Sequence, residues 1–495
     1  MKNKKIFILI VLIILLGTFL RFYNLGSKSF WQDEGATALA IKKYGTLGII
    51  KNTYEKGQIL PEYYYPYNDD LPFYYIFLSG WVKIFGMNEF SFRSFSAISG
   101  SLALIAIFYL GKYLFDEKVA LLSTFLASIN PILIWYSQEA RQYTYLLFLS
   151  LISLILLLKS LKEDKTKYIF GFLVVSTIIA YSNFPWLMFI IFEGLFALFI
   201  ICKNYFKKPR LSKKIVIAFV LIGIIYLPII GRAVFTHTNT IKFYGRPSLS
   251  QIARLSVQLS NWLYPSESMR QKIYSFSLHF TLYEWALLLS VLLSALLFNV
   301  LFLVGIAKSF YKKNSAILLM LMFFFPVLFA LLVSLIHPIV TIFHIKLMLY
   351  IIPAYLIFVS IGITRTKFSG HLTAIILIII ILSILPLYAF FTNTDKQQFR
   401  EAAEFLPKNE LIFVNIQAAQ VTFKYYYGEK DNVIGINDVN ELESHLNNVN
   451  SFWMLLTFTK YSDPENKIRE YSNENYRLME KKEFFDIELL HYKKI

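Results

Sequence analysis

The feature that most constrains the fold of this chain is a series of long apolar runs. A helix needs about 20 mainly apolar residues to cross a bilayer, and the 495-residue chain holds about eleven runs of this kind. The pattern predicts a polytopic α-helical membrane protein whose transmembrane domain covers residues 1–391. The runs lie at 5–22, 92–111, 119–136, 143–158, 168–183, 186–202, 215–232, 281–307, 316–336, 347–363 and 371–391.

The loops between these runs alternate in charge. Lys and Arg are enriched in cytoplasmic loops, and basic residues gather in every second loop, for example at 159–167, 203–214 and 308–313. The loops between them carry few basic residues. We therefore predict a multi-pass protein of the plasma (inner) membrane with a cytoplasmic N-terminus. Because the formal charge of +17 is confined largely to such loops, it does not indicate a nucleic-acid partner.

The same alternation predicts two segments on the extracytoplasmic face. The first outer loop covers residues 23–91, in which the apolar stretch from Pro72 to Phe85 is too short to span and is expected to lie along the membrane as an interfacial helix. The second segment covers residues 392–495. With Cys202 as the single cysteine, an internal disulfide is excluded.

Residues 392–495 have the mixed pattern of a small α/β domain. Helices are predicted at 398–406 and 441–446, and buried strands at 411–414 and 452–456. No glycine-rich phosphate loop occurs in this segment, so we expect no nucleotide cofactor there.

Several charged and polar residues fall on the predicted outer face, close to the hydrocarbon. The pair Asp33-Glu34 follows Trp31, just beyond the first span. Charges at such depth are costly and are functional by default. A carboxylate can act as a general base, and cations suit a phosphate group. The candidates at the outer face include Asp33, Glu34, Asp70, Glu89, Arg93, Gln138, Glu139, Arg141, Tyr143, His344 and Lys346.

Each of these residues also has a purely structural interpretation. Asp33 could be the N-cap of a helix over 35–44, and Glu139 could form an ion pair with Arg141 that steadies a tight turn. Lys346 could extend its ammonium group to the interface, and Arg93 could do the same. Glu193, inside the sixth span, is more typical of an interhelical hydrogen bond than of a proton relay.

Four motifs follow one another in a fixed order and carry a resemblance. They are Trp31-Gln32-Asp33-Glu34, Pro72-Phe73-Tyr74-Tyr75, the Gly-x-x-Glu-x-x-x-Arg segment 86–93, and the segment 136–143. Together they resemble bacterial and archaeal members of glycosyltransferase family 39, which include the RgtA/B/C/D-like transferases and are related to dolichyl-phosphate-mannose protein mannosyltransferases. The resemblance extends over the whole chain and implies the GT-C fold of C-type membrane glycosyltransferases.

The resemblance implies a chemistry. The donor would be a sugar on a polyprenyl phosphate, and the acceptor a lipid, glycan or protein. Asp33 would take the proton from the acceptor hydroxyl as general base, and a single displacement would invert the anomeric centre. Glu34 would orient the acceptor or help to hold a metal. Arg141 and Lys346, with Arg93, would stabilise the charge that grows on the leaving phosphate.

The remaining implied residues bind substrate. Family members often have His-Pro-Pro where this chain has Asp70-Leu71-Pro72, so the role of that histidine passes to Asp70 or is lost. A divalent metal stays an open alternative, with Asp33, Glu34 and Asp70 as its ligands. The substrate-binding residues would be Asp70, Tyr74, Gln138, Glu139 and Tyr143. All these groups are expected to converge at one water-facing cavity on the extracytoplasmic side.

Two other functions stay open at this point. A polytopic lipid or glycolipid transporter or flippase without catalysis would also have many spans and charges near the membrane, although such carriers commonly show internal repeats. An oligosaccharide ligase would need a larger outer loop. The loop 233–280, flanked by Arg232 and containing Arg246, Arg254 and Trp262, is the candidate for it.

Overall fold

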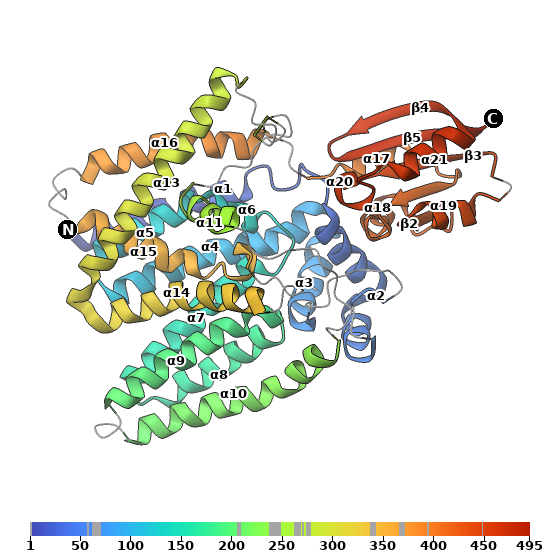
Figure 1. Ribbon diagram of the computed structural model, residues 1–495. Helices are drawn as coiled ribbons and strands as arrows, with labels where there is room; N and C mark the ends of the chain where they lie inside the picture. Colours follow the sequence, from blue (N-terminus) through green and yellow to red (C-terminus); the bar gives the residue numbers. More distant parts are fainter. Residues whose placement is uncertain are drawn as a thin grey trace. The chain divides into compact units, whose positions relative to one another are not determined.

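The computed structural model describes residues 2–56, 59–61, 71–204, 209–236, 249–261, 269, 272–273, 279–336, 343–365, 372–393, 396–447 and 449–495. The chain divides into two compact units, each built from two separate stretches (Figure 1). Residues 1–24 and 94–393 form what we call the helical unit, and residues 25–93 and 394–495 form the mixed unit. Contacts thus group the first outer loop with the C-terminal segment, whereas the division of the chain at residue 391 stays a prediction.

All eleven predicted apolar runs fall on helices. Helices α8 and α15 have only 15 and 14 residues, and the run 119–136 is divided between α5 with 13 residues and α6 with 7. The helices are α1 (Lys2–Phe22), α4 (Glu89–Leu114), α5 (Glu117–Ile129), α6 (Pro131–Ser137), α7 (Tyr143–Lys162), α8 (Thr166–Ala180), α9 (Leu187–Asn204), α10 (Pro209–Thr236), α11 (Leu249–Asn261), α13 (Leu282–Ser309), α14 (Lys313–Ile336), α15 (Ile351–Thr364) and α16 (Leu372–Thr392).

Helices that can cross a membrane dominate the helical unit. Within the described residues, seven stretches are long and apolar enough, or eight if the bent pair α5–α6 is a single span. One of the seven, Leu282–Leu335, contains both α13 and α14. The predicted class of a polytopic α-helical membrane protein is therefore confirmed.

The run predicted as one span at 119–136 is bent by 61° between α5 and α6. Pro131 opens α6, and the residue before a proline is pushed out of the helical conformation. Asn130 has the extended conformation that this requires, and its side chain accepts a hydrogen bond from the backbone N–H of Leu133 at 3.1 Å. An Asn-Pro pair within an apolar run thus ends one helix and begins another.

At this bend, Arg21 of α1 donates hydrogen bonds to backbone carbonyl groups at the end of α5. Arg21 is 1% exposed, and its guanidinium group donates to the carbonyl oxygens of Ala127 and Ser128, in the last turn of α5, at 3.1 and 3.2 Å. The last carbonyls of a helix have no partner within it. A buried arginine therefore fixes α1 against the end of α5.

Helix α15 lies at the centre of the helical unit. Each residue from Ile351 to Ile363 is buried, and a helix that is apolar on all sides suits such a position. It packs on α13 through two glycines. A Cβ atom at Gly305 would overlap the carbonyl oxygen of Phe358, and one at Gly362 would overlap that of Leu301. Small residues allow this close approach of two backbones.

We expect Gly362→Ala to destabilise the protein by about 2–3 kcal/mol, because α13 and α15 must separate to admit the methyl group. The melting temperature of the purified protein in detergent measures the loss. Gly223 of α10, which has open space where a Cβ atom would stand, provides the matched control. Gly223→Ala should leave the melting temperature unchanged or raise it slightly, and an equal fall for both variants would contradict the close packing.

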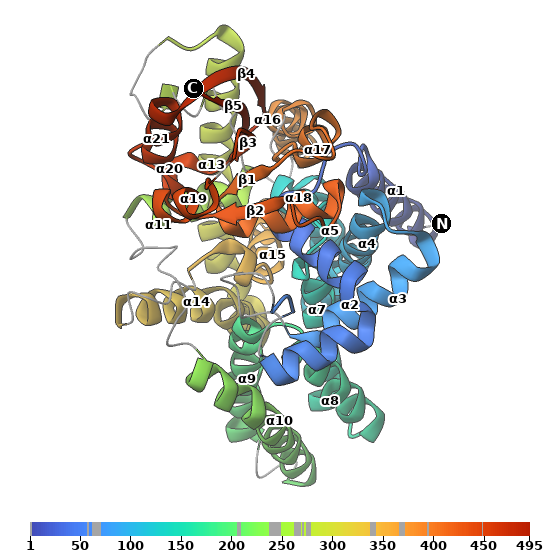
Figure 2. The same cartoon turned by 90° about the vertical axis from the view of Figure 1, so that its right-hand side faces the viewer.

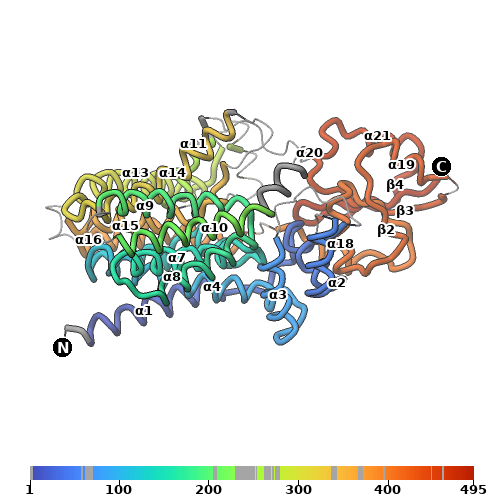
Figure 3. Tube along the Cα trace, turned by 90° about the horizontal axis from the view of Figure 1, so that it is seen from below, coloured from blue at the N-terminus to red at the C-terminus, as the bar shows by residue number. Residues whose placement is uncertain are grey.

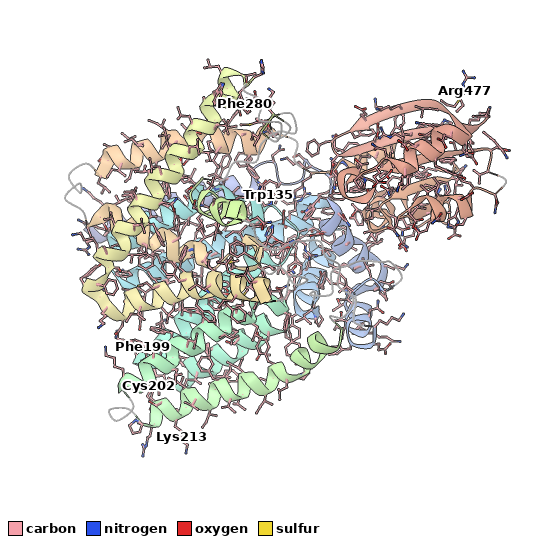
Figure 4. The ribbon with its side chains drawn as sticks, viewed as in Figure 1. Trp135, Phe199, Cys202, Lys213, Phe280 and Arg477 are labelled. Carbon is pink, nitrogen blue, oxygen red and sulfur yellow. The ribbon has the colours of Figure 1, made fainter. Side chains whose placement is uncertain are left out.

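The basic loops lie together at one end of the helical unit. Asp116 pairs with Arg365, and Asp164 pairs with Lys214. Lys203 donates to the side chain of Asn314, and Ser315 donates to the carbonyl of Leu114. Figure 4 shows Cys202 and Lys213 at this same end, where α9 ends and α10 begins. The alternation of loop charge therefore corresponds to a real separation in space within this unit.

In the mixed unit, the first outer loop forms α2 (Gln32–Lys56) and α3 (Pro72–Phe85). The predicted helix at 72–85 is confirmed, and its place along the membrane stays a prediction. Asp33 lies in the first turn of α2, since this helix begins at Gln32 rather than after Glu34. The structural interpretation of Asp33 as N-cap is therefore wrong.

The C-terminal segment forms a five-stranded sheet with helices on both faces (Figure 2). The strand order is β2-β1-β3-β5-β4. Strands β2 and β3 each pair in parallel with β1. Strand β5 pairs antiparallel with β3, and β4 pairs antiparallel with β5. The four predicted elements are all present, and the predicted α/β class is confirmed. The elements are α17 (Phe399–Phe405), β1 (Ile412–Asn415), α18 (Gln420–Tyr427), β2 (Val433–Ile436), α19 (Val439–His445), β3 (Ser451–Leu456), α20 (Thr459–Ser462), α21 (Lys467–Asn475), β4 (Tyr476–Phe484) and β5 (Ile487–Lys494).

Alternation along the strands divides the core of this sheet between its two faces. On β3, Trp453 and Leu455 point to the side covered by α17 and α18. Phe452, Met454 and Leu456 point to the side covered by α19 and α21. One face thus packs on helices that also contact the first outer loop, which brings the sheet to the Asp33 region.

Candidate active site

The candidate residues belong to both units. Asp33, Glu34, Tyr74 and Arg93 lie in the mixed unit, and Gln138, Glu139, Arg141, Tyr143 and Lys346 lie in the helical unit. Asp70 lies outside the described residues. The expected convergence of the two groups at one cavity stays a prediction, so each group is described here within its own unit.

Asp33 is held in the first turn of α2 and is 4% exposed. A negative side chain is favourable at this end of a helix, because the first N–H groups carry partial positive charge. Gly35, two residues after Asp33, faces α18 so closely that a Cβ atom there would overlap Thr422. The hydroxyl group of Thr422 donates to the carbonyl of Gln32 at 3.0 Å. Helix α18 thus fixes the turn that carries Asp33.

Glu34 is fully buried and is neutralised by two cations. The guanidinium group of Arg93 donates through Nε to Glu34 Oε1 at 2.9 Å and through Nη2 to Oε2 at 2.7 Å. Lys396 Nζ donates to the same Oε2 at 3.1 Å. A bidentate arginine–carboxylate pair has a defined geometry. It fixes the orientation of the Glu34 side chain next to Asp33.

The remaining donors of Arg93 bind the loop that leads into α2. Nη1 donates to the carbonyl oxygens of Leu25 and Lys28 at 3.1 and 2.7 Å, and Nη2 donates to that of Ser29 at 2.9 Å. Arg93 is thus the centre of a network within the mixed unit. Its contacts are those of a residue that holds a loop in place, and the phosphate-binding role expected of it stays a prediction.

Sequence reasoning gave no site role to three residues of this network, namely Lys396, Arg400 and Tyr426. Arg400 pairs with Glu89 at 2.9 Å. The hydroxyl group of Tyr426 donates to Glu89 at 2.9 Å and accepts from the backbone N–H of Phe30 at 2.7 Å. Burial, together with the Glu89 carboxylate, raises the pKa of Tyr426 above its ordinary value, so the phenol stays a donor. No local pattern signals such contacts, which join residues more than 300 positions apart.

In the helical unit, a short turn after α6 carries Gln138, Glu139 and Arg141. Glu139 accepts a hydrogen bond from Trp135 Nε1 at 2.6 Å. The amide nitrogen of Gln138 donates to the carbonyl oxygens of Leu20, Arg21 and Tyr23, at the end of α1, at 2.9–3.3 Å. Gln138 therefore closes the end of α1, and its expected contact with substrate stays a prediction.

Arg141 is positioned through its backbone. Its carbonyl oxygen accepts from the hydroxyl group of Ser96 at 3.1 Å, and the hydroxyl group of Thr144 donates to the carbonyl of Ser96 at 2.9 Å. The first bond ties the turn to α4, and the second ties the start of α7 to the same residue of α4. Two small polar residues therefore set the place of the predicted phosphate-binding residue on the helical unit, where Arg141 is 4% exposed.

The structure brings Tyr143 and Lys346 together. Lys346 Nζ lies 5.9 Å from the centroid of the Tyr143 ring, which in turn lies 5.2 Å from that of Tyr136. A cation at this distance over an aromatic ring is attracted to it. Two of the predicted residues, 203 positions apart in the chain of 495, thus belong to one neighbourhood within the helical unit.

His344 lies beside Lys346 and was expected only to be near the outer face. Its Nδ1 accepts from the backbone N–H of Lys346 at 3.2 Å. Burial, followed by the positive charges of Lys346 and Arg254, lowers the pKa of His344 from 6.5 to about 3. Of the residues considered for a ligase loop, Arg246 and Trp262 lie outside the described residues.

Because the pKa of His344 is lowered to about 3, acid should destabilise the folded protein through this residue. Below pH 6.5 the unfolded chain takes up a proton that the folded chain does not bind. The stability it contributes is present above pH 6.5 and is lost as the pH falls toward 3. We expect His344→Gln to reduce the fall in melting temperature between pH 7 and pH 4.5. His445→Gln, at an exposed position, should leave that fall unchanged; identical curves for His344→Gln and the unmodified protein would contradict this assignment.

The interhelical hydrogen bond predicted for Glu193 is confirmed. The hydroxyl group of Ser153 on α7 donates to Glu193 on α9, with oxygen–oxygen distances of 2.9 and 3.1 Å. Ser176 on α8 lies 3.2 Å from the same hydroxyl group. The bond connects three helices in the interior of the helical unit.

The described residues add no support for the divalent metal that the resemblance left open. Among those residues, no group of three or more His, Cys, Asp or Glu side chains is placed to hold a metal ion. Of the expected ligands, Asp33 and Glu34 are described and Asp70 is not. Glu34 is already engaged by Arg93 and Lys396, so the expected metal stays a prediction.

The arrangement of the helices with a small C-terminal α/β segment is the GT-C fold. Over 97% of both chains, the protein matches the structure of ArnT from Cupriavidus metallidurans in the apo state, with 11% identity and a TM-score of 0.62. ArnT bound to undecaprenyl phosphate matches with 11% identity, 97% coverage of both chains and a TM-score of 0.56. The archaeal oligosaccharyltransferase AglB from Archaeoglobus fulgidus, in complex with an inhibitory peptide and a dolichol-phosphate, matches over 96% of this chain and 73% of its own, with 15% identity and a TM-score of 0.54.

A match to a protein family supports the same assignment as the fold. Residues 69–230 match the family described as dolichyl-phosphate-mannose-protein mannosyltransferase. This confirms the resemblance given by the sequence motifs. No curated protein matches the chain significantly. Fold and family match together support a membrane glycosyltransferase of the GT-C type.

Proposed function

We propose that the protein transfers a sugar from a polyprenyl-phosphate donor to a lipid, glycan or protein acceptor of the cell envelope. The observation that carries the proposal is the match along 97% of both chains to the GT-C fold of ArnT, which is known with undecaprenyl phosphate bound. The family match over residues 69–230 supports the same class of donor.

In this proposal Asp33 is the general base. Its carboxylate takes the proton of the acceptor hydroxyl, and the acceptor oxygen attacks the anomeric carbon while the bond from that carbon to the phosphate oxygen breaks. The products are the glycoside with inverted configuration and the free polyprenyl phosphate. A helix N-terminal position and burial of Asp33 support this role, because they hold the carboxylate in one place.

Arg141 and Lys346 stabilise the negative charge that develops on the departing phosphate. Lys346 lies by the ring of Tyr143, which limits the directions open to its flexible side chain. A lysine acts on a phosphate as a point charge, without the two parallel hydrogen bonds of an arginine. Arg141 therefore supplies the directional contact of the pair, and Lys346 adds charge.

The proposal also includes an orientation in the membrane. The loops at the basic end of the helical unit would be cytoplasmic, and residues 392–495 would be extracytoplasmic. We expect a reporter fused after Lys308 to be active on the cytoplasmic side and one fused after Ile495 to be active on the outer side. The reverse pair of results would contradict the orientation.

Transfer is distinguished from transport by following the sugar and the lipid separately. Membranes that contain the protein are given polyprenyl-phosphate sugar labelled in both parts. A transferase forms a new glycosidic bond and releases one polyprenyl phosphate for each sugar transferred. A transporter or flippase moves the intact labelled lipid across the membrane, and this result without any new bond would overturn the proposal.

A further inference from the structure

Within the mixed unit, the C-terminal segment contacts the helix that carries Asp33. Helix α18 packs beside α2, and the two can be followed side by side in Figures 1 and 3. Residues 396–397 reach the same turn from the stretch that precedes α17. Segments at the two ends of the sequence thus build one local structure around the start of α2.

Four hydrogen bonds define this contact besides the ion pair to Glu34. The side-chain oxygen of Gln397 accepts from the backbone N–H of Gln32 at 3.2 Å, and its carbonyl oxygen accepts from the hydroxyl group of Ser29 at 2.6 Å. Thr422 donates to the carbonyl of Gln32, and Tyr426 accepts from the N–H of Phe30. Four of the six residues from Ser29 to Glu34 therefore have a partner in the C-terminal segment, namely Ser29, Phe30, Gln32 and Glu34.

The charges of the contact are buried. The side chains of Glu34, Arg93 and Lys396 are 0, 2 and 7% exposed. A buried carboxylate with two buried cations needs both of them in place, because removing one partner changes the balance of charge in a region of low dielectric constant. Lys396 is the partner that comes from the C-terminal segment, and it binds the oxygen Oε2 that Arg93 also binds.

We propose that Lys396 is a positioning residue for Asp33. It holds Glu34, together with Arg93, so that the first turn of α2 keeps one geometry and the Asp33 carboxylate keeps one position. The C-terminal α/β segment thereby takes part in catalysis without touching substrate. This inference rests on the proposed role of Asp33 as general base. It assigns to the C-terminal segment the task of ordering the catalytic turn.

A displacement of about 1 Å in a catalytic group can cost about a hundredfold in rate. We therefore expect Lys396→Met to lower kcat for sugar transfer by about 10–100-fold, while KM for the polyprenyl-phosphate donor changes by less than about threefold. Lys396→Arg should restore kcat to within about threefold of the unmodified protein, because the guanidinium group also reaches a carboxylate. Lys494→Met, at an exposed position of β5, is the matched control and should leave both constants unchanged.

Three measurements on the same purified proteins decide the matter. The fraction of folded protein at the assay temperature is determined first, and kcat is expressed per folded molecule. If Lys396→Met lowers only the folded fraction and leaves this kcat unchanged, the residue is merely structural and the inference is overturned. If KM for the donor rises while kcat is constant, Lys396 contributes to binding and the inference is equally overturned.

The same series separates this inference from the proposed function. Asp33→Asn is measured beside the lysine variants. If Asp33→Asn transfers sugar at the normal rate, Asp33 is not the general base, and Lys396 then has no catalytic carboxylate to position. Loss of transfer in Asp33→Asn with an unchanged kcat in Lys396→Met would leave the proposed function standing and refute the role of Lys396 alone.

Discussion

Asp33→Asn should lower the rate of sugar transfer by about a thousandfold, with no change in folding. General base catalysis by a positioned carboxylate contributes about 10²–10⁴-fold, and an amide cannot accept the proton. Asn has nearly the same size and can occupy the same place in the first turn of α2. The initial rate of transfer from a labelled polyprenyl-phosphate sugar, at saturating donor, measures the effect.

The matched control for this variant is Asp431→Asn, at an exposed position of the same unit. It should transfer sugar at the rate of the unmodified protein. Equal melting temperatures for all three proteins would show that the loss is chemical. Transfer by Asp33→Asn at more than about a tenth of the normal rate would contradict general base catalysis by this residue.

Arg93→Met should have the largest effect on stability, a loss of about 3–5 kcal/mol in the free energy of unfolding. The change leaves Glu34 with one of its two cationic partners, and the buried carbonyls of Leu25, Lys28 and Ser29 lose their donor. Buried acceptors left without a partner are costly. Denaturation of the purified protein, followed by aromatic fluorescence, measures the loss.

Lys43→Met is the control that tests whether the loss of stability in Arg93→Met arises because the ion pair of Arg93 with Glu34 is buried. Lys43 pairs with Glu429 in the same unit, but both side chains are partly exposed, and such pairs contribute about 0–1 kcal/mol. If Arg93 instead binds the donor phosphate, Arg93→Met should have normal stability and a raised KM for the donor. That result would show that the network around Glu34 is not what makes Arg93 important.

The membrane helices could be predicted well from the sequence, because their apolar runs are long and the charge of the loops repeats. The bend at Asn130 was missed, although its Asn-Pro pair is a local signal that could have been used. In the C-terminal segment, β1 and β3 were found as continuous apolar runs, whereas β2, β4 and β5 were missed. Most side chains of β4 are exposed, so this strand has no apolar alternation to detect.

The candidate site shows a sharper limit of sequence reasoning. Asp33, Arg141 and Lys346 could be selected because isolated charges next to apolar runs stand out. Lys396 and Tyr426 could not, since they lie in a polar segment where such residues are common. Glu34 was given a chemical role on account of its neighbour Asp33, but its partners depend on contacts 59 and 362 positions away. Long-range contacts of this kind leave no periodic signal in one sequence.

The central claim is that Asp33 activates an acceptor hydroxyl for a single displacement at the anomeric carbon. The stereochemistry of the product tests it most directly. A donor carrying ¹³C at the anomeric position is supplied to the protein, and NMR of the donor and of the product gives the configuration at this carbon. We predict inversion. Retention of configuration would require two displacements or another nucleophile, and would contradict the account.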